Sequence, residues 1–314
     1  MNSNNLISII VPTHNRAWCI ERAIKSILDQ SSKNWELIIV DDGSTDNTQE
    51  VVNTYLSDSR ISYFHKENGG VGSARNFGVS KAKAKYVTFL DSDDELMNNA
   101  IFQMEKDIPL LSKKNVSILL YFAKKTTDAR YIDLRFNDLQ VITYEDAIKG
   151  LWPKIETLQL MPKEIFNFVT FPELGNGLEL ILWFNILKKH GNALVRTRYL
   201  RIYHTKHDTR LTGSKSIISR SKTMPLLYEV YFDEFEKDYI RLNKSRLAYY
   251  YTEKGVFELI DGKKKIGRGS LLKACGFNKS KLLVIMTIYI ASFLPASLFC
   301  RLTIWAHSFK KIIK

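Results

Sequence analysis

The first hundred residues alternate between short apolar runs and longer stretches whose apolar residues recur every three or four positions. Leu6–Val11 is a continuous apolar run that ends at Pro12, and Trp18–Gln30 follows with apolar residues at helical spacing. Leu37–Val40 and Tyr86–Leu90 are further apolar runs of strand length. Strands that alternate with helices in this way predict an α/β fold with a parallel sheet covered by helices on both faces.

Polar clusters follow three of these strands at the point where each strand ends. They read Thr-His-Asn-Arg at residues 13–16, Asp-Asp-Gly-Ser-Thr-Asp at residues 41–46 and Asp-Ser-Asp-Asp at residues 91–94. Ligands of open α/β sheets bind at the carboxyl ends of the strands. We therefore expect the three clusters to lie together and to form the functional site.

The composition limits which binding partners and which cellular compartment are expected. The chain of 314 residues has a formal net charge of +13, which suits phosphates, nucleic acid or acidic lipid headgroups. It lacks a basic recognition helix and a set of aromatic stacking strands, so nucleic acid is not expected. Its three cysteines form no Cys-x-x-Cys pair, which argues against a disulfide framework or a zinc site and favours a reducing compartment. No positive residue precedes the first apolar run, as one would in a signal peptide.

Asp91 and Asp93 stand two positions apart as a strand ends, so both side chains can point the same way. Two carboxylates aimed at one point repel each other unless a cation lies nearby. Mg²⁺ or Mn²⁺, with diphosphate oxygens completing its shell, is the natural occupant and would neutralise a diphosphate leaving group. The alternative is a loop of solvated acids in which Asp94 caps the next helix.

The other two clusters offer groups that can contact a nucleotide. Asp41 and Asp42 can accept hydrogen bonds from a nucleobase or a ribose, although Asp-Gly with Ser and Thr is also a common turn sequence. Thr13, Asn15 and Arg16 follow the first strand in the same way. All five residues are candidates for donor binding.

Arg75 lies just beyond a glycine-rich stretch, Gly69-Gly70-Val71-Gly72. Glycines let the backbone approach a ligand, and the N-terminus of the following helix favours an anion. Such a stretch alone is often only a turn. Arg75, on that following helix, is the better candidate for binding a diphosphate.

Four segments together resemble a known family. SIIVPTHNR, ELIIVDDGSTDNT, NGGVGSARNFG and YVTFLDSDDEL resemble, in order and spacing, the inverting family-two glycosyltransferases of the GT-A fold, of the type that builds bacterial surface polysaccharides. The resemblance is specific over residues 6–105 and thinner from there to about residue 210. It implies a Rossmann-like, mixed, mainly parallel sheet with helices on both faces. It also implies that Asp91 and Asp93 handle ribose and metal. It also implies that Thr13, Asp41 and Asp42 contact the nucleobase region, and Pro12 and Ser92 within the same segments join the expected donor-binding set.

An inverting transferase needs one general base that deprotonates the acceptor hydroxyl. The family resembled here places this base in an acidic pair before a helix similar to WELWLRLL. When Trp183 is aligned with the family tryptophan, Glu179 takes the base position, whereas Leu178 stands where the first acid would be. Glu179 is therefore the predicted base, and the alternative is an exposed glutamate in the first turn of the predicted helix Leu178–Lys189.

A histidine and several basic residues follow this helix. The family often has a histidine near this position that reaches the metal or the diphosphate, which makes His204 a candidate third ligand; a structural histidine is the alternative. His207 is a weaker candidate. The basic residues Arg198, Arg201, Lys206 and Arg210 either steer a phosphorylated acceptor or form a solvated face.

The chain is expected to have three parts. Residues 1–213 form the GT-A domain, with a nucleotide-binding half over residues 1–115 and an acceptor half over residues 116–213. Residues 214–275 form a helical extension. Residues 276–314 form apolar and basic helices that associate with a membrane.

The membrane expectation rests on the pattern of the last forty residues. Leu282–Leu294 is apolar nearly all round, and Pro295 interrupts any single helix. Beyond the proline, apolar residues recur every three or four positions and basic residues lie mostly off that stripe, which is typical of a helix in the membrane interface. A single transmembrane span and a helical pair that closes the core or a dimer contact are the alternatives.

These observations predict an inverting, non-processive glycosyltransferase with a metal-bound, UDP-linked donor and a lipid-linked or polysaccharide acceptor. No QxxRW-type motif of a processive synthase is present. We expect the enzyme at the cytoplasmic face of the cell membrane, peripheral unless the C-terminal segment spans it, and as a possible homodimer. The alternative, motivated by Leu178, is a non-catalytic subunit of a membrane glycan assembly that binds a nucleotide-sugar.

Overall fold

The computed structural model describes residues 6–126, 135–173, 179–204, 220–278, 282–295, 298–299 and 301. The chain divides into two compact units, the first made mainly of residues up to 206 and the second mainly of residues from 207 onward. The predicted boundary between residues 213 and 214 lies outside the described residues.

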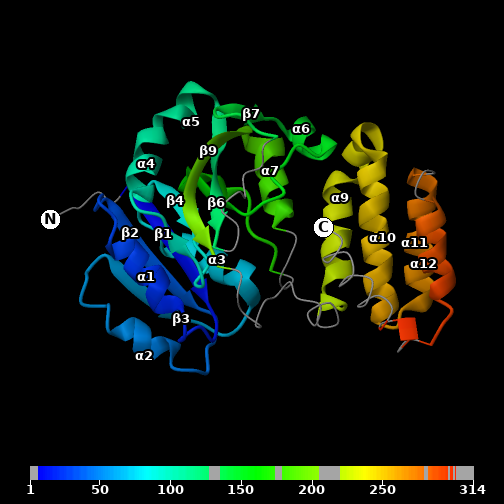
Figure 1. Cartoon of the computed structure of the whole chain (residues 1–314), viewed down its shortest axis with the longest axis horizontal. Coiled ribbons are helices and arrows are strands. Elements are labelled where there is room, and N and C mark those ends of the chain that lie inside the picture. The colour runs from blue at the N-terminus through cyan, green and yellow to red at the C-terminus, as the bar shows by residue number, and fades with distance from the viewer. Residues whose placement is uncertain are drawn as a thin grey trace. The chain divides into compact units, whose positions relative to one another are not determined.

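Within the described residues of the first unit, nine strands form one sheet in the order β3-β2-β1-β4-β8-β6-β9-β5, with β7 also paired to β9 (Figure 1). The strands are β1 (Ile7–Thr13), β2 (Trp35–Asp41), β3 (Ile61–His65), β4 (Tyr86–Phe89), β5 (Glu95–Leu96), β6 (Val116–Lys125), β7 (Gln140–Ile142), β8 (Thr157–Pro162) and β9 (Asn192–Tyr203). The predicted strands of the first hundred residues are confirmed, and so is the mixed sheet.

Parallel pairing is confined to β3-β2-β1-β4 and to the pair β6–β9. The strands β5, β7 and β8 pair antiparallel to their neighbours, so the second half of the sheet is more antiparallel than expected. The expectation extended the βα alternation of the first hundred residues, and that alternation stops after β4. Because β8 runs against β4, its first residues lie at the edge of the sheet where β4 ends.

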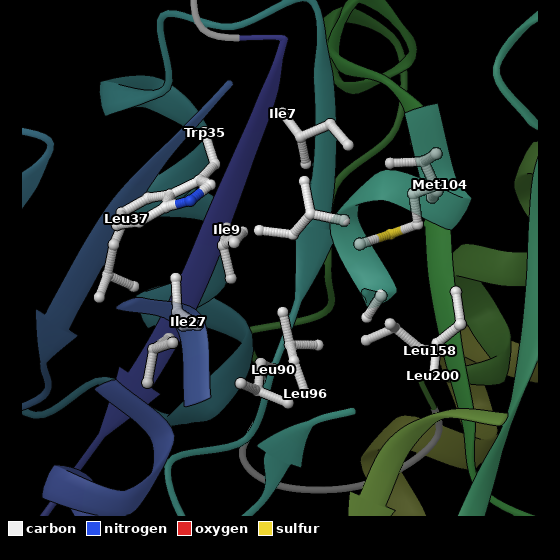
Figure 2. Packing of buried hydrophobic residues seen from close by; sticks show 14 of the residues in the cluster. Ile7, Ile9, Ile27, Trp35, Leu37, Leu90, Leu96, Met104, Leu158 and Leu200 are labelled. Atoms are coloured by element: carbon white, nitrogen blue, oxygen red, sulfur yellow. The ribbon is translucent and has the colours of Figure 1, made fainter. Parts of the chain in front are cut away.

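Helices cover both faces of this sheet. They are α1 (Ile20–Leu28), α2 (Thr48–Asn53), α3 (Gly70–Lys81), α4 (Ala100–Asp107), α5 (Pro109–Lys113), α6 (Tyr144–Lys149) and α7 (Leu180–His190), with a 3₁₀ turn at Lys163–Asn167. Alternate residues of a strand point to opposite faces. Ile9 of β1 packs with Ile27 of α1 in the main core, as Figure 2 shows, whereas Ile10 faces α3.

Helix α3 approaches β1 closely because residue 78 has no side chain. A Cβ atom on Gly78 would stand 2.5 Å from Cγ2 of Ile10, well inside van der Waals contact. The glycine therefore seats α3 against the sheet, and with it Arg75, one turn earlier on the same helix.

The second unit is helical in its described residues. It contains α9 (Met224–Leu242), α10 (Lys244–Ile260), α11 (Lys264–Phe277) and α12 (Leu282–Ala291). Tyrosines fill its interior, and the hydroxyls of Tyr231 and Tyr239 bond to each other at 2.7 Å. The buried pair Lys254–Glu258 is completed by Ser270 of α11, whose hydroxyl donates to Glu258 at 2.6 Å. The predicted helical character of this region is confirmed.

Among the described residues, no helix is long and apolar enough to cross a membrane. Helix α12 is nevertheless largely exposed despite its apolar sequence, with Leu283 81% and Ile290 66% accessible. The predicted interfacial stripe beyond Pro295 falls mostly outside the described residues, since only positions 298, 299 and 301 of it are covered.

Helices α10 and α11 cross at a pair of glycines. A Cβ on Gly255 would stand 2.9 Å from the carbonyl oxygen of Gly267, and a Cβ on Gly267 would stand 2.8 Å from that of Gly255. Gly269, two positions along α11, has nothing within 4 Å of where its Cβ would be. Gly267 and Gly269 of α11 therefore differ in what surrounds them.

Gly267→Ala should lower the free energy of unfolding by about 1–3 kcal/mol, because the added methyl forces the two helix backbones apart. Gly269→Ala should raise it by up to about 1 kcal/mol, since alanine favours a helix and meets no obstacle there. Urea denaturation of the full chain measures both. Equal effects of the two substitutions would contradict the close crossing.

Candidate active site

The three polar clusters lie at one edge of the sheet. Thr13 is opposite Asp41 in the register of β1 and β2, and the amide of Asp42 donates to the Thr13 carbonyl at 2.8 Å. Strand β4 lies on the other side of β1 and leads through Leu90 into Asp91. Parallel strands thus deliver the three clusters to neighbouring positions.

Asn15 and Arg16 tie the first cluster to the second. The side-chain oxygen of Asn15 accepts from the backbone amide of Thr45 at 2.8 Å. The backbone amide of Asn15 donates to the Ser44 hydroxyl at 2.8 Å. Asn15 has a φ of +52°, a conformation that asparagine tolerates better than most residues. The Arg16 amide donates to the Thr48 hydroxyl at 3.0 Å. These bonds fix the loops of the edge, and Pro12 lies buried in β1 beneath them.

The carboxylates of Asp41 and Asp42 are engaged within the protein. Asp41 accepts from the amide of Ser44 at 2.7 Å and from the hydroxyl of Tyr63 at 2.6 Å. Asp42 accepts from Lys66 at 2.8 Å and from the amides of Gly69 and Gly70 at 2.9 and 2.7 Å. Both aspartates therefore hold the turns that follow β2, and their contact with a nucleobase or ribose stays a prediction.

The Thr13 hydroxyl is different. It is buried, and no described residue satisfies its hydrogen-bonding capacity. A buried hydroxyl without a partner is costly unless a ligand supplies one. Of the residues predicted to contact the nucleobase region, Thr13 is the one with an open group.

Arg75 brings the predicted base beside the third cluster. Its guanidinium donates to Asp91 Oδ1 at 2.9 Å and lies 3.6 Å from Glu179 Oε1, with the Phe171 ring beneath it at 5.2 Å. Glu179 precedes α7, and its side chain is 42% exposed. Residues from α3, from the end of β4 and from the start of α7 thus meet at one guanidinium.

Arg201 holds the third cluster from the other side. This buried residue of β9 donates to Asp91 Oδ2 at 2.5 Å and forms a two-nitrogen pair with Asp94, which has no exposed surface. Burial alone would raise the pKa of Asp91, but the attraction of Arg201 and Arg75 outweighs it and lowers the pKa to about 2. The interpretation of Arg201 as part of a solvated face is wrong, because it is an internal partner of two carboxylates.

The three predicted metal ligands are not assembled into one site. Asp91 is held by two arginines, and the His204 ring bonds to Glu95 at 2.6 Å. Within the ranges that the structure describes, no group of three His, Cys, Asp or Glu residues is placed to hold a metal ion.

Asp93 remains the open carboxylate of this loop. Its carbonyl accepts from Arg22 at 2.5 Å, but no donor or cation among the described residues engages its side chain. Ser92 is buried, and its carbonyl accepts from the Cys19 thiol at 3.6 Å. The donors present fit an ion held by one carboxylate and by phosphate oxygens of a substrate, not one held by three protein ligands.

Two participants were not anticipated from the sequence. Arg22 of α1 bonds the Asp93 carbonyl and lies 3.4 Å from Glu95. Glu156, an exposed residue just before β8, has a raised pKa because the surrounding protein desolvates its carboxyl; Arg201 opposes this rise, and the negative charge of Asp91 adds to it. No local motif marks Glu156, since its place depends on β8 running antiparallel to β4.

The opposite edge of the sheet has a different character. A cavity of about 480 Å³ lies there, lined by Tyr86, Val116, Pro162 and His190 among others. Its lining holds no cluster of carboxylates and arginines comparable to the one around Asp91. The chemistry-bearing residues therefore belong to the edge that carries the three clusters.

Comparison with known proteins agrees with this arrangement. The model of glycosyl transferase family 2 matches residues 8–156. An uncharacterized glycosyltransferase of Rickettsia typhi is 35% identical over 266 residues, covering 80% of this chain and 79% of that protein. The chain belongs to glycosyltransferase family 2.

Other members of the family differ in length. The glucosyltransferase WfgD of Escherichia coli, named for UDP-Glc and α-D-GlcNAc-diphosphoundecaprenol, is 30% identical over 67% of this chain and 81% of that protein. Two longer glycosyltransferases, of Rickettsia bellii and Rickettsia conorii, are 34% and 35% identical, and the matched segment spans only 26% and 30% of their length.

Solved structures share the fold of this family member. TarS 1–349 of S. aureus in complex with UDP-GlcNAc has a TM-score of 0.59 at 17% identity, covering 90% of this chain and 91% of that one. The mannosyltransferase PcManGT of Pyrobaculum calidifontis, in complex with GDP-Man and Mn²⁺, has a TM-score of 0.57 at 16% identity and covers 98% of this chain and 86% of that one. The expected GT-A fold with a helical C-terminal region is confirmed.

Arg201→Met should lower the free energy of unfolding by about 3–5 kcal/mol, because it leaves the buried Asp94 carboxylate without its partner. Arg198→Met, on the same strand, is the matched control. Arg198 is exposed and donates to Gln103 at 2.6 Å, so its loss should cost no more than about 1 kcal/mol. Urea denaturation compares the two, and similar midpoints would refute the buried role of Arg201.

Proposed function

We propose that this family member is an inverting glycosyltransferase that moves a sugar from a UDP-linked donor to a lipid-linked or polysaccharide acceptor. The observation that carries the proposal is the guanidinium of Arg75, which lies within ion-pair distance of both Asp91 and Glu179. It links the strand end of the predicted donor site to the predicted base. The names of WfgD and of the TarS complex, both containing a UDP-sugar, support the choice of donor.

The reaction is a single displacement. The acceptor hydroxyl oxygen attacks the anomeric carbon of the donor sugar, and the bond from that carbon to the diphosphate oxygen breaks, so the nucleoside diphosphate leaves with the electron pair. Glu179 takes the proton of the acceptor hydroxyl, and the configuration at the anomeric carbon inverts. Arg75 orients the Glu179 carboxylate by the ion pair.

The donor occupies the edge formed by the three clusters. The open hydroxyl of Thr13 bonds the nucleobase or ribose, and the backbone held by Asn15, Arg16, Asp41 and Asp42 shapes that pocket. Asp91, kept anionic by its two arginines, faces the ribose and Ser92 lies beside it.

Asp93 would hold Mg²⁺ or Mn²⁺ together with the diphosphate of the donor. When bound, the ion supplies positive charge against the leaving diphosphate. His204 keeps its bond to Glu95 and takes no part as a ligand in this arrangement. The Mn²⁺ named for PcManGT supports the choice of metal.

The enzyme works at the cytoplasmic face of the membrane, where a lipid-linked acceptor is available. The exposed apolar surface of α12 and the net charge of +13 support peripheral binding to an anionic bilayer. A second copy of the chain is the other occupant of that surface. Sedimentation with anionic vesicles distinguishes the two. A protein that binds the membrane should sediment with the vesicles, whereas a protein whose surface is covered by a second copy should stay in solution.

Glu179→Gln should lower kcat for sugar transfer by roughly 10²–10⁴, because the amide cannot accept the proton. The donor Kd should stay within about twofold, since the base does not touch the nucleotide. Glu164→Gln is the control: it also replaces an exposed glutamate, but at the opposite edge of the sheet.

Transfer is measured by mass analysis of products from a panel of nucleotide-sugars and lipid extracts. Full kcat in Glu179→Gln would remove this residue from the role of base. A wild-type chain that binds a donor but glycosylates no acceptor in the panel would instead support the non-catalytic subunit.

Chelation of divalent ions should abolish transfer, and added Mg²⁺ or Mn²⁺ should restore it. Asp93→Asn should raise the metal concentration for half-maximal activity by about 10- to 100-fold, because the ion loses its protein carboxylate. Asp58→Asn, before β3 at the opposite edge, should not change it. Activity that persists in excess chelator would exclude a metal-dependent reaction.

A further inference from the structure

We propose that Glu156 is an acceptor-binding residue, whose carboxylate receives hydrogen bonds from hydroxyl groups of the acceptor sugar beside Glu179. The inference rests on the proposed transferase function and extends it to a residue outside the four family segments. It follows from where the fold places Glu156, from its charged neighbours and from the absence, among the described residues, of a donor to its carboxylate.

The topology brings Glu156 to the edge that carries the site. Strand β8 starts at Thr157, which pairs with Phe122 near the end of β6, and the Ala123 amide donates to the Glu156 carbonyl at 3.1 Å. Ala123 in turn pairs with Arg201 across β6 and β9. Glu156 and Arg201 therefore lie on the two sides of one β6 residue.

The charges around Glu156 are those of the candidate active site. Arg201 and Arg75 attract its carboxylate, whereas Asp91 and Glu179 repel it. These four groups also pair among themselves, through Asp91 with both arginines and through Glu179 with Arg75. Glu156 thus lies in the electrostatic field of these four groups but forms none of the ion pairs that join them.

No donor among the described residues bonds the Glu156 carboxylate, and the residue is exposed. A carboxylate that is partly desolvated and repelled by two acids gains from neutral hydroxyl donors, which bond its oxygens without adding charge. Vicinal hydroxyls of a sugar supply two such donors. The proposed base, Glu179, acts on an acceptor hydroxyl in the same neighbourhood, so the acceptor sugar is the ligand that meets both carboxylates.

The test compares Glu156→Gln, Glu156→Asp and Glu164→Gln with the wild-type chain. A panel of UDP-glucose, UDP-galactose, UDP-GlcNAc and GDP-mannose with lipid-linked and oligosaccharide acceptors first identifies the pair that the wild type uses. Initial rates with that pair give kcat and KM for the donor and for the acceptor. Hydrolysis of the donor without acceptor reports on the donor site alone.

Glu156→Gln should raise the acceptor KM by about 10- to 100-fold, because charge-assisted hydrogen bonds are lost. The donor KM, the rate of donor hydrolysis and the melting temperature should stay unchanged. Glu156→Asp keeps the charge on a shorter side chain and should give an intermediate acceptor KM. Glu164→Gln should match the wild type.

Three results would overturn the inference in distinguishable ways. An unchanged acceptor KM in Glu156→Gln, with normal transfer by the wild type, refutes the binding role alone. A collapse of kcat at unchanged acceptor KM makes Glu156 the base in place of Glu179. Absence of transfer by the wild type with every pair in the panel refutes the proposed function and this inference together.

Discussion

The buried guanidinium of Arg201 is the interaction on which the arrangement of the site depends. It lies between Asp91 and Asp94, which are 110 and 107 positions away along the chain. A buried charge is stable only when it is paired and hydrogen-bonded, so neither the arginine nor the loop after β4 can take its place without the other. The third polar cluster is therefore held in place by a residue of β9.

This dependence divides the site into a scaffold and a set of open groups. The four oxygens of Asp41 and Asp42 and the carboxylate of Asp91 are satisfied within the protein. Among the described residues, the Thr13 hydroxyl, the Asp93 carboxylate and the Glu156 carboxylate are open groups without a hydrogen-bonding partner. Each lies beside a satisfied group that holds its backbone or its neighbour in place. In the proposed reaction, the scaffold determines where the substrates lie and the open groups bind them.

Much of the first hundred residues could be predicted because local patterns determine it. The apolar runs of β1, β2 and β4 are long enough to identify buried strands, and the spacing in α1 identifies the face that meets Ile9. The polar clusters follow from the strand ends, since parallel strands must finish at one edge. These arguments use only residues that are close together in the sequence.

The remaining differences between expectation and structure concern pairs that are far apart in the sequence. Arg201 looked like one of several surface cations, because nothing near it in the chain reveals that Asp94 is its partner. His204 was expected to reach a metal, but Glu95 occupies its ring nitrogen through the antiparallel pairing of β5 and β9. Glu156 was overlooked for the same reason. In each case the missing information was the register of an antiparallel strand.

Asp42, a residue of a shared family segment, accepts hydrogen bonds from the amides of Gly69 and Gly70. It therefore has a structural role at the start of α3 as well as its proposed place beside the donor. These bonds fix the first turn of α3, the helix on which Arg75 lies. Loss of donor binding after a change at Asp42 would thus be ambiguous, because the helix could unravel at its first turn while every ligand-facing atom remained in the chain. Such a residue would be retained among relatives because of its role in folding as much as because of its role in catalysis.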